Sequence, residues 1–163
     1  MKPIPKNSAI LDILVGWMNH TEMGEMMCQP SVGYPDEVLK NILDNQYEGV
    51  DNRMVGLLDE TKNVLGGVFM IDIDPKNAKA EIHQIFSPAY RGKFVLRAHR
   101  WLLKYCRTEL RLQSLYGYVS DAANEKVKAF EPMGWEKMAI LPKYYITQNG
   151  AEAAHVYFLD LEK

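Results

Sequence analysis

The sequence predicts an α/β protein in which helices pack on a mostly antiparallel sheet. Three observations support this class. Apolar residues recur at helical spacing in the first 45 residues, short apolar runs alternate with turns between Gly49 and Ser87, and a helical period returns after Lys93. The composition, 47% hydrophobic and 25% charged, is ordinary for a globular chain. A length of 163 residues fits one domain spanning residues 1–163.

Two helices are expected at the start of the chain. Ser8 can cap a helix from about Ala9 to Asn19, and a second helix begins at Pro35 and stops near Asn45. The loop between them is rich in methionine. Together with Met18 of the first helix, the loop methionines fit either helix packing or an adaptable binding wall, and the group comprises Met18, Met23, Met26 and Met27.

The rest of the chain is predicted to alternate between strands and helices in the overall order ααβββαβαββ. A three-stranded meander is expected first, with turns at residues 61–63 and 74–77. An amphipathic helix with a basic outer face follows, and then a strand, a shorter helix broken at Pro132 and two final strands. The expected ranges are strands 53–60, 63–73 and 80–87, helix 93–109, strand 114–121, helix 123–133, and strands 134–141 and 155–161.

Charge and cysteine content point to a cytoplasmic protein without a metal or a nucleic-acid partner. The net charge of −2 gives no reason to expect binding to nucleic acid or an acidic membrane. The N-terminal apolar run is interrupted by Asp12, and no segment is long enough to span a membrane. Cys28 and Cys106 lie far apart and the four histidines are scattered, so reduced thiols and no zinc site are expected.

The segment Arg91-Gly92-Lys93 stands where a strand passes into the long helix. A helix N-terminus offers unpaired backbone N–H groups and partial positive charge, so such a loop can bind phosphate. The side chains of Phe94 and Leu96 occupy positions where glycine would let a phosphate approach, and we expect the Phe94 ring near the approach path. The alternative is a plain basic turn that begins a helix.

This loop and the order of elements resemble the GNAT superfamily of acyl-CoA-dependent N-acyltransferases over most of the chain. In that family an apolar strand end is followed by proline, two residues, arginine or glutamine, and a glycine-rich start to the pyrophosphate-binding helix. Phe94 and Leu96 depart from the pattern at its two later small residues. The matching positions are Phe86, Pro88, Tyr90, Arg91, Gly92, Lys93, Val95, Arg97 and Ala98.

A second segment, "DAANEKVKAFEPMGWEK", is similar to the family's downstream motif of asparagine, tyrosine and Gly-Phe. Asn124 lies one residue from the asparagine position, and Phe130 stands where the tyrosine usually does. The family's tyrosine often returns a proton to the departing thiolate, which phenylalanine cannot do. A replacement could come from another tyrosine, and the candidates are Tyr116, Tyr118, Tyr144 and Tyr145.

The GNAT resemblance implies an α/β fold with six to seven strands and four helices, and transfer of an acetyl group from acetyl-CoA to a primary amine. The cofactor would lie in a V-shaped opening between the strand before the loop and the strand around residues 115–119. Glu81 and His83 share a strand face and are candidates for the base, although both also suit a solvated strand face. The implied cofactor-binding residues are Phe86, Arg91, Gly92, Lys93, Phe94, Val95, Leu96, Asn124 and Phe130.

The whole chain also resembles GNAT-related head-assembly proteins of short-tailed, lambdoid-type bacteriophages. That resemblance implies a late morphogenesis factor that works in the host cytoplasm, with phage structural or internal virion proteins as partners and virion association left open. The basic face of the long helix would then serve a protein partner, and its alternative is a solvated face. We therefore predict an assembly factor with a degenerate acyl-CoA loop, with N-acetyltransferase activity as the alternative function.

Overall fold

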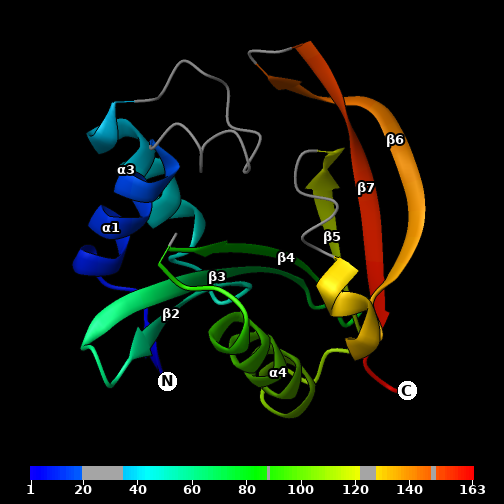
Figure 1. Ribbon diagram of the computed structural model, residues 1–163, viewed down its shortest axis with the longest axis horizontal. Coiled ribbons are helices and arrows are strands. Elements are labelled where there is room, and N and C mark those ends of the chain that lie inside the picture. Colours follow the sequence, from blue (N-terminus) through cyan, green and yellow to red (C-terminus); the bar gives the residue numbers. More distant parts are fainter. Residues whose placement is uncertain (20–34, 88, 122–127, 148–149) are drawn as a thin grey trace.

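The computed structural model consists of one seven-stranded sheet with helices on both faces (Figure 1). The strands are ordered β1-β2-β3-β4-β5-β7-β6, and all neighbours are antiparallel except β4 and β5. This mixed, mostly antiparallel α/β architecture is the predicted fold class. The structure describes residues 1–19, 35–87, 89–121, 128–147 and 150–163.

The described elements follow the predicted order closely. The helices are α1 (Ser8–Met18), α3 (Asp36–Gln46) and α4 (Lys93–Thr108), and η1 (Lys128–Met133) is a 3-10 helix. The strands are β1 (Lys2–Pro5), β2 (Asn52–Asp59), β3 (Val64–Asp74), β4 (Lys79–Phe86), β5 (Ser114–Ser120), β6 (Glu136–Thr147) and β7 (Gly150–Asp160).

The N-terminus differs from prediction in two respects. Asn7, and not Ser8, caps α1, because its side chain accepts a hydrogen bond from the Ile10 N–H at 3.0 Å. Residues 2–5 form an additional strand, β1, that pairs with β2 at the edge of the sheet. This strand was not expected from the sequence, because Pro3 and Pro5 lie within it. An edge strand tolerates proline because one of its sides needs no N–H donor.

The C-terminal half also departs from the predicted bounds. The shorter helix appears as the 3-10 helix η1, and the segment of the predicted helix before residue 128 lies outside the described residues. Strand β6 continues past Pro142 to Thr147 and β7 begins at Gly150, so both strands are longer than expected. The ladder between β6 and β7 shifts register between Leu141 and Tyr145, which accommodates the proline within an edge strand.

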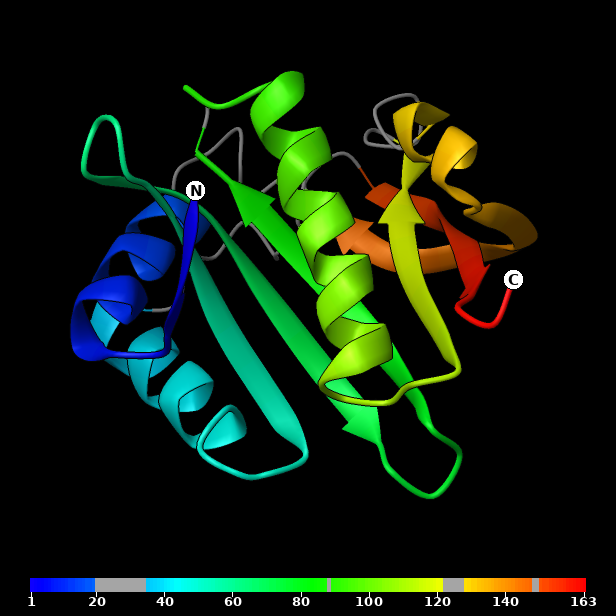
Figure 2. The same cartoon turned by 90° about the horizontal axis from the view of Figure 1, so that it is seen from below.

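The core divides into two layers, one on each face of the sheet (Figure 2). On one face, α1 and α3 cover even-numbered residues of β3 such as Val68 and Met70. On the other face, α4 covers odd-numbered residues such as Phe69 and Ile71. This alternation follows from the two-residue period of a strand, and it explains why β3 is buried over most of its length. No helix in the described part of the chain could cross a membrane.

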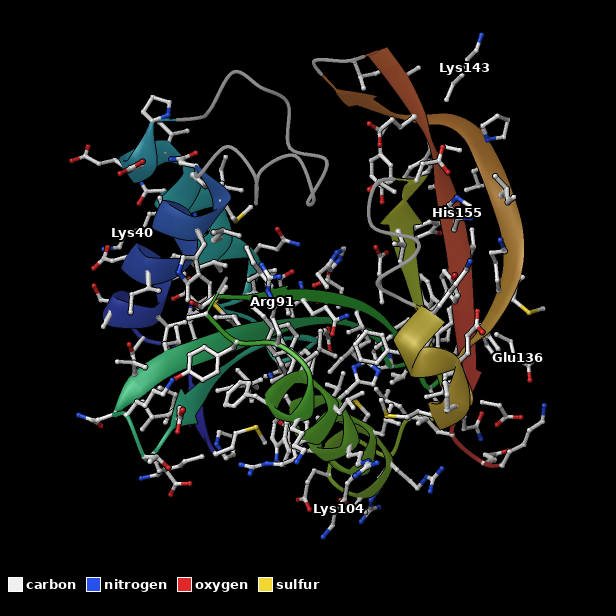
Figure 3. All side chains as sticks on the ribbon, viewed as in Figure 1. Lys40, Arg91, Lys104, Glu136, Lys143 and His155 are labelled. Atoms are coloured by element: carbon white, nitrogen blue, oxygen red, sulfur yellow. The ribbon has the colours of Figure 1, made fainter. Side chains whose placement is uncertain are left out.

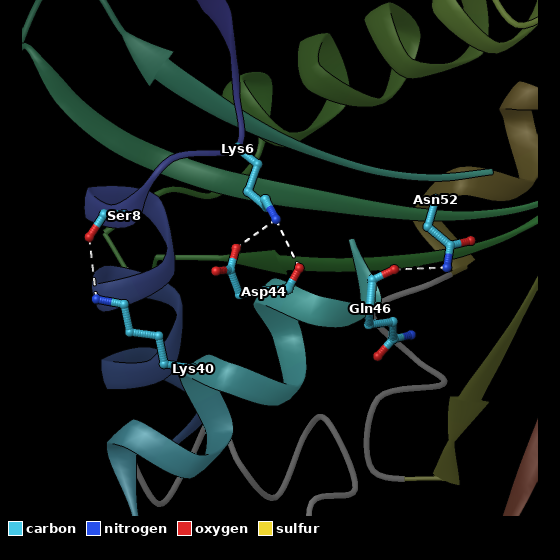
Figure 4. Close-up of polar contacts among 6 residues, drawn as sticks. All are labelled: Lys6, Ser8, Lys40, Asp44, Gln46 and Asn52. Carbon is cyan, nitrogen blue, oxygen red and sulfur yellow. Dashed lines mark hydrogen bonds and ion pairs between the residues drawn. The ribbon is translucent and has the colours of Figure 1, made fainter. Parts of the chain in front are cut away.

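Polar contacts hold α3 in place between α1 and the start of β2 (Figure 4). The Lys6 ammonium donates to the Asp44 carboxylate at 2.6 Å and to the Asp44 carbonyl at 2.9 Å. The Asn52 amide donates to the Gln46 carbonyl at 3.0 Å. These contacts fix the C-terminal end of α3 above the sheet, where Gln46 and its neighbour Tyr47 meet β3.

Strands β4 and β5 are joined only at their beginnings. Their parallel ladder covers three residue pairs, from Lys79 opposite Ser114 to Glu81 opposite Tyr116. On its other side β5 pairs with β7 along its whole length, and Figures 1 and 2 show the ends of β4 and β5 diverging. The connection between them is α4, as expected for parallel neighbours, which need a crossover. The N-terminus of α4 therefore stands beside the end of β4.

Candidate functional site

The loop between β4 and α4 is anchored to the hairpin of β2 and β3. The Ser87 N–H donates to the Gly66 carbonyl at 3.0 Å, and the Tyr90 N–H donates to the Ser87 carbonyl at 2.8 Å. The Tyr90 hydroxyl donates to the Asp59 carboxylate at 2.8 Å, which lowers the pKa of Asp59. Burial, followed by this contact with Asp59, raises the pKa of Tyr90. Two hydrogen bonds thus tie the loop to the hairpin, and a third closes a turn within the loop, before the helix begins.

The N-terminus of α4 has the features of an anion site. Gly92 is the N-cap with φ of +55°, no side chain caps the helix, and the first turn contains no acidic residue. Leu96 N–H makes the first helical hydrogen bond, to the Gly92 carbonyl at 3.0 Å. Arg91, labelled in Figure 3, and Lys93 are both exposed. The helix start therefore combines backbone donors with two cationic side chains and open space at Gly92.

The Phe94 ring lies against β3. A Cβ atom built on Gly66 would lie only 2.5 Å from Phe94 Cζ, so the ring occupies the space that this glycine leaves. The Phe94 ring also contacts the rings of Tyr90 and Phe86, with centroid distances of 4.4 and 6.4 Å. Strand β3 is on the side of β4 opposite to β5. The Phe94 ring therefore fills space beside β3, on the side of β4 away from β5.

The two neighbouring residues of the loop motif also point into the protein. Val95 and Leu96 are partly buried and pack against the core beneath α4, as does Phe86 at the end of β4. Substitution of small residues by Phe94 and Leu96 thus adds apolar contacts on the sheet side of the helix. The N–H groups of the first turn are unaffected, because backbone donors do not depend on the side chain.

Three ionisable side chains meet on the other face of the sheet, the one covered by α1 and α3. His83 Nε2 lies 3.2 Å from Asp72 Oδ2 and 3.2 Å from Glu81 Oε1. Asp72 and Glu81 are direct neighbours across β3 and β4, and His83 follows Glu81 by two residues on the same face. The structure thus places the two predicted residues together and adds Asp72, which sequence reasoning missed.

The pKa shifts in this cluster have identifiable causes. Burial lowers the pKa of His83, but the hydrogen bond that His83 donates to Asp72 and the charges of Glu81 and Asp72 outweigh it, so the net shift is upward. Burial raises the pKa of Glu81, His83 opposes this shift and Asp72 adds to it. Glu81 is therefore a stronger base than a solvated carboxylate, and the protonated form of His83 is favoured relative to that of a solvated imidazole.

The end of α3 and the beginning of β5 complete the surroundings of the cluster. Gln46 Nε2 lies 3.5 Å from Asp72 Oδ2 and 3.3 Å from the Tyr47 hydroxyl. Burial, followed by the charge of Asp72, raises the pKa of Tyr47 well above its usual value. On the other side, burial and then the charge of Glu81 raise the pKa of Tyr116. Both tyrosines therefore stay protonated beside the carboxylates.

A row of tyrosines extends from this cluster across β5 to β6. Tyr116 and Tyr118 meet edge to face at 6.1 Å, and Tyr118 stacks on Tyr144 at 5.2 Å with an interplanar angle of 8°. Tyr144 in turn meets Tyr145 at 4.9 Å. The four tyrosines named as replacements for the missing acid thus form one continuous row, and Tyr116 is the member beside Glu81.

Phe130 is buried where the GNAT resemblance placed a catalytic tyrosine. Its ring stacks on His99 of α4 at a centroid distance of 4.2 Å and an angle of 25°. Trp135 Nε1 donates to His99 Nε2 at 2.7 Å. Burial lowers the pKa of His99 to about 4, so this imidazole is neutral. Phe130 therefore joins η1 to α4, while Asn124 and the loop methionines Met23, Met26 and Met27 lie outside the described residues.

A cavity of about 360 Å³ lies at the opposite end of α4 from the loop. It is bounded by the C-terminal half of α4, η1 and the end of β7, with Leu103, Met133 and Leu161 among its lining residues. It contains neither the α4 N-terminus nor the carboxylates of β3 and β4. Among the described residues, no group of histidine, cysteine and carboxylate side chains is arranged to hold a metal ion.

Comparison with known proteins supports the predicted fold. A family model described as "Protein of unknown function (DUF2824)" matches residues 37–159. The chain is similar to a spermidine N-acetyltransferase from Vibrio cholerae in complex with CoA and spermine, with a TM-score of 0.89 and 16% identity over 99% of this chain and 96% of that chain. A structure of the spermidine/spermine N-acetyltransferase from Vibrio cholerae with manganese ions gives a TM-score of 0.80 and 16% identity. That match covers 99% of this chain and 93% of that chain. No curated protein matches the sequence. The GNAT fold predicted from the sequence is thereby confirmed.

We predict that Gly66→Ala destabilises the protein because the new Cβ would overlap the Phe94 ring. The expected loss is about 1–3 kcal/mol in the free energy of unfolding, measured by urea denaturation. Phe94→Leu replaces the ring by a smaller side chain. The double variant Gly66→Ala with Phe94→Leu should therefore be less destabilised than the sum of the two single changes. Gly16→Ala is the matched control, because no atom lies within 4 Å of its new Cβ. Strictly additive losses of stability in the double variant would contradict the predicted overlap between the new Cβ at position 66 and the Phe94 ring.

We also predict a pH dependence of stability that depends on His83. Because its pKa lies above the ordinary 6.5 in the folded chain, protonated His83 stabilises the fold below that pH, and the contribution disappears as the pH rises through the folded pKa. Asp72→Asn should lower the pKa of His83, as followed by NMR titration of its ring protons. Glu109→Gln removes an exposed carboxylate that follows α4, on the other face of the sheet, and serves as control. An unchanged His83 titration in Asp72→Asn would refute the assignment.

Proposed function

This chain belongs to the DUF2824 family, and we propose that it is an acyl-CoA-dependent N-acetyltransferase that acts on a primary amine. The observation that carries the proposal is the N-terminus of α4, which has no side-chain cap, stands beside diverging strands and carries two exposed cationic side chains. The likeness to the spermidine N-acetyltransferases supplies the fold. The assignment of activity rests on the residues of this chain.

The residues present fit the pyrophosphate of an acyl-CoA. Lys93, Phe94 and Val95 contribute the first-turn N–H groups of α4, and Arg91 adds a guanidinium beside them. Gly92 has open space where another residue would carry a side chain. The thioester of the bound acyl-CoA supplies the acyl group. Because the Phe94 ring is packed on Gly66, it does not remove space on the side of β4 that faces β5.

Glu81 is the proposed base for the acceptor amine. It stands at the last residue pair that joins β4 to β5, where the two strands begin to diverge. An alkylammonium group must lose a proton before its nitrogen can attack a carbonyl carbon. Burial raises the pKa of the Glu81 carboxyl, which makes it a better acceptor for that proton, and His83 and Asp72 fix its position.

No tyrosine hydroxyl is available at Phe130 to protonate the leaving thiolate. Water can supply that proton, and Tyr116 is the tyrosine whose position beside Glu81 favours it as a replacement. The carboxylates and the row of tyrosines together favour a cationic acceptor, because carboxylates pair with ammonium groups and aromatic faces attract cations. The Vibrio cholerae enzyme was crystallised with spermine, and a polyamine is therefore the first acceptor to test.

Calorimetric titration tests the cofactor half of the proposal. We expect the full chain to bind acetyl-CoA and CoA, and Lys93→Glu to weaken binding at least about tenfold, since it places negative charge at the phosphate site. Lys104→Glu changes the same helix three turns further on and should leave binding unchanged. Absence of binding by the wild-type chain, or equal effects of the two variants, would rule out the phosphate site.

An acetylation assay tests the proposed transfer reaction. Spermidine, spermine and a lysine peptide are offered as acceptors, and the release of the CoA thiol is measured. Glu81→Gln should lower turnover about a hundredfold while leaving the affinity for acetyl-CoA intact. Glu109→Gln is the control, because this exposed carboxylate follows α4 on the other face of the sheet. Tight binding of acetyl-CoA with no acetylation of any amine would retain the cofactor site and exclude the transferase.

A second candidate function is assistance in bacteriophage head assembly, with phage structural or internal virion proteins as partners. The observation that favours it is the exposed basic face of α4. Among the described residues, none of its four cations takes part in a recorded salt bridge, and they are Arg97, Arg100, Lys104 and Arg107. Unpaired cations along one helix face suit an acidic protein surface. The resemblance noted from the sequence agrees with this role.

Complementation separates this role from catalysis. In a bacteriophage that encodes this chain, deletion of the gene should reduce the yield of infectious particles. The triple variant Arg100→Gln, Lys104→Gln and Arg107→Gln should fail to restore that yield, whereas Glu81→Gln should restore it. Normal particles from the deletion would exclude the assembly role, and failure of Glu81→Gln alone would assign the phenotype to catalysis.

A further inference from the structure

His99 of α4 carries a buried hydrogen-bond donor that the described residues leave without a partner. The indole N–H of Trp135 donates to His99 Nε2 at 2.7 Å, and an indole nitrogen can only donate, so Nε2 carries no proton. Burial lowers the pKa of His99 to about 4, so the ring is neutral at neutral pH and its single proton is on Nδ1. Nδ1 is buried and has no hydrogen-bond partner among the described residues. The tautomer is therefore fixed, with its N–H group unused.

Gln84 of β4 supplies the opposite kind of unused group. Its Oε1 atom is an acceptor that is buried and also lacks a partner among the described residues. Gln84 is paired with Phe69 across β3 and β4, so the two side chains lie on the same face of the sheet, the one that α4 covers. The Phe69 ring lies 6.4 Å from the His99 ring. The unused donor and the unused acceptor thus belong to one region beneath α4.

This region lies where β4 and β5 have separated. The ladder between the two strands ends at Glu81, and Gln84 follows in the diverging part of β4. His99 lies close to Phe69 on one side, and on the other it stacks at 4.2 Å on Phe130 of η1, which follows β5 in the chain. His99 is also about 9 Å along the helix axis from the start of α4, the proposed pyrophosphate site.

On the basis of the acyl-CoA function proposed above, we propose that His99 and Gln84 bind the pantetheine arm of the acyl-CoA. An amide oxygen of the arm accepts from His99 Nδ1–H, and an amide N–H of the arm donates to Gln84 Oε1. The arm carries two amides and is attached to the pyrophosphate, so from the start of α4 it passes along the helix between the diverging strands. A buried polar group without a partner destabilises a fold, and a ligand that supplies the partner gains affinity from it.

The role of His99 is binding and not proton transfer. Its ring stacks on Phe130, which stands in the place of the family's tyrosine. A histidine with a pKa of about 4 holds no second proton at neutral pH, so it has none to give to a departing thiolate. His99 therefore orients the arm, and the thiolate still takes its proton from water or from Tyr116.

Nitrogen NMR of the full chain with isotope-labelled histidine tests the donor, with His99 assigned by comparison with His99→Phe. Free His99 should show a protonated Nδ1 and an unprotonated Nε2 at neutral pH, and CoA should shift the Nδ1 resonance. The compound 3′-phospho-ADP has the nucleotide and pyrophosphate of CoA but no pantetheine arm. It should bind and leave that resonance unchanged.

A His99 resonance that bound CoA does not move, or that both compounds move alike, would overturn the assignment of His99 while leaving the phosphate site intact. Failure of the wild-type chain to bind either compound would instead refute the proposed function, and the assignment of His99 and Gln84 with it.

Gln84→Met tests the acceptor, because methionine has a similar length and no amide oxygen. Calorimetric titration should show CoA binding about three- to tenfold weaker, with the affinity for 3′-phospho-ADP unchanged. Urea denaturation should show no loss of stability, since the variant removes a buried acceptor that has no partner. Gln113→Met is the matched control, because Gln113 is exposed and precedes β5. Wild-type affinity for CoA in Gln84→Met, or equal weakening towards both compounds, would overturn the assignment of Gln84.

Discussion

The packing of α4 across β4 and β5 is the interaction on which the rest of the architecture depends. Ala98, Leu102 and Cys106 recur every four residues along the helix and are fully buried against the sheet. Full burial of a side chain such as Leu102 stabilises the fold by about 1.5–3 kcal/mol. The direct ladder between β4 and β5 has only three pairs, so α4 is what holds the two strands together while their ends diverge. The same packing fixes the helix N-terminus beside the end of β4.

Phe94 shows how a loop can change its side chains and keep its backbone donors. The large ring is accommodated because Gly66 has no side chain at the facing position of β3. The ring then adds contacts with Tyr90 and Phe86 to the anchorage of the loop. The large side chain in the loop is thus matched by a glycine in β3. The start of α4 retains its backbone donors and its partial positive charge.

The ionisable cluster depends on cross-strand register. Asp72 faces Glu81 across β3 and β4, and His83 lies between their carboxylates. The negative charges of the two carboxylates raise the pKa of His83 and so favour the protonated imidazole between them. Gln46 and Tyr47, at and just after the end of α3, lie beside Asp72 and help to bury it. Burial raises the energetic cost of an unpaired charge, so the position of these two residues affects the protonation of the cluster.

The sequence by itself determined most of the secondary structure and the sharing of a face by Glu81 and His83. Both follow from local periodicity, since a strand repeats every two residues and a helix every 3.6. Helix α4 and strands β2 to β5 accordingly lie within about one residue of the predicted bounds. Tertiary structure alone decided the partnership of Asp72 with His83, the direction of the Phe94 ring, the burial of Phe130 on His99 and the extension of β6 past Pro142. These features depend on register between strands and on the rotation of a helix over a sheet, which are set by contacts between residues distant in the chain.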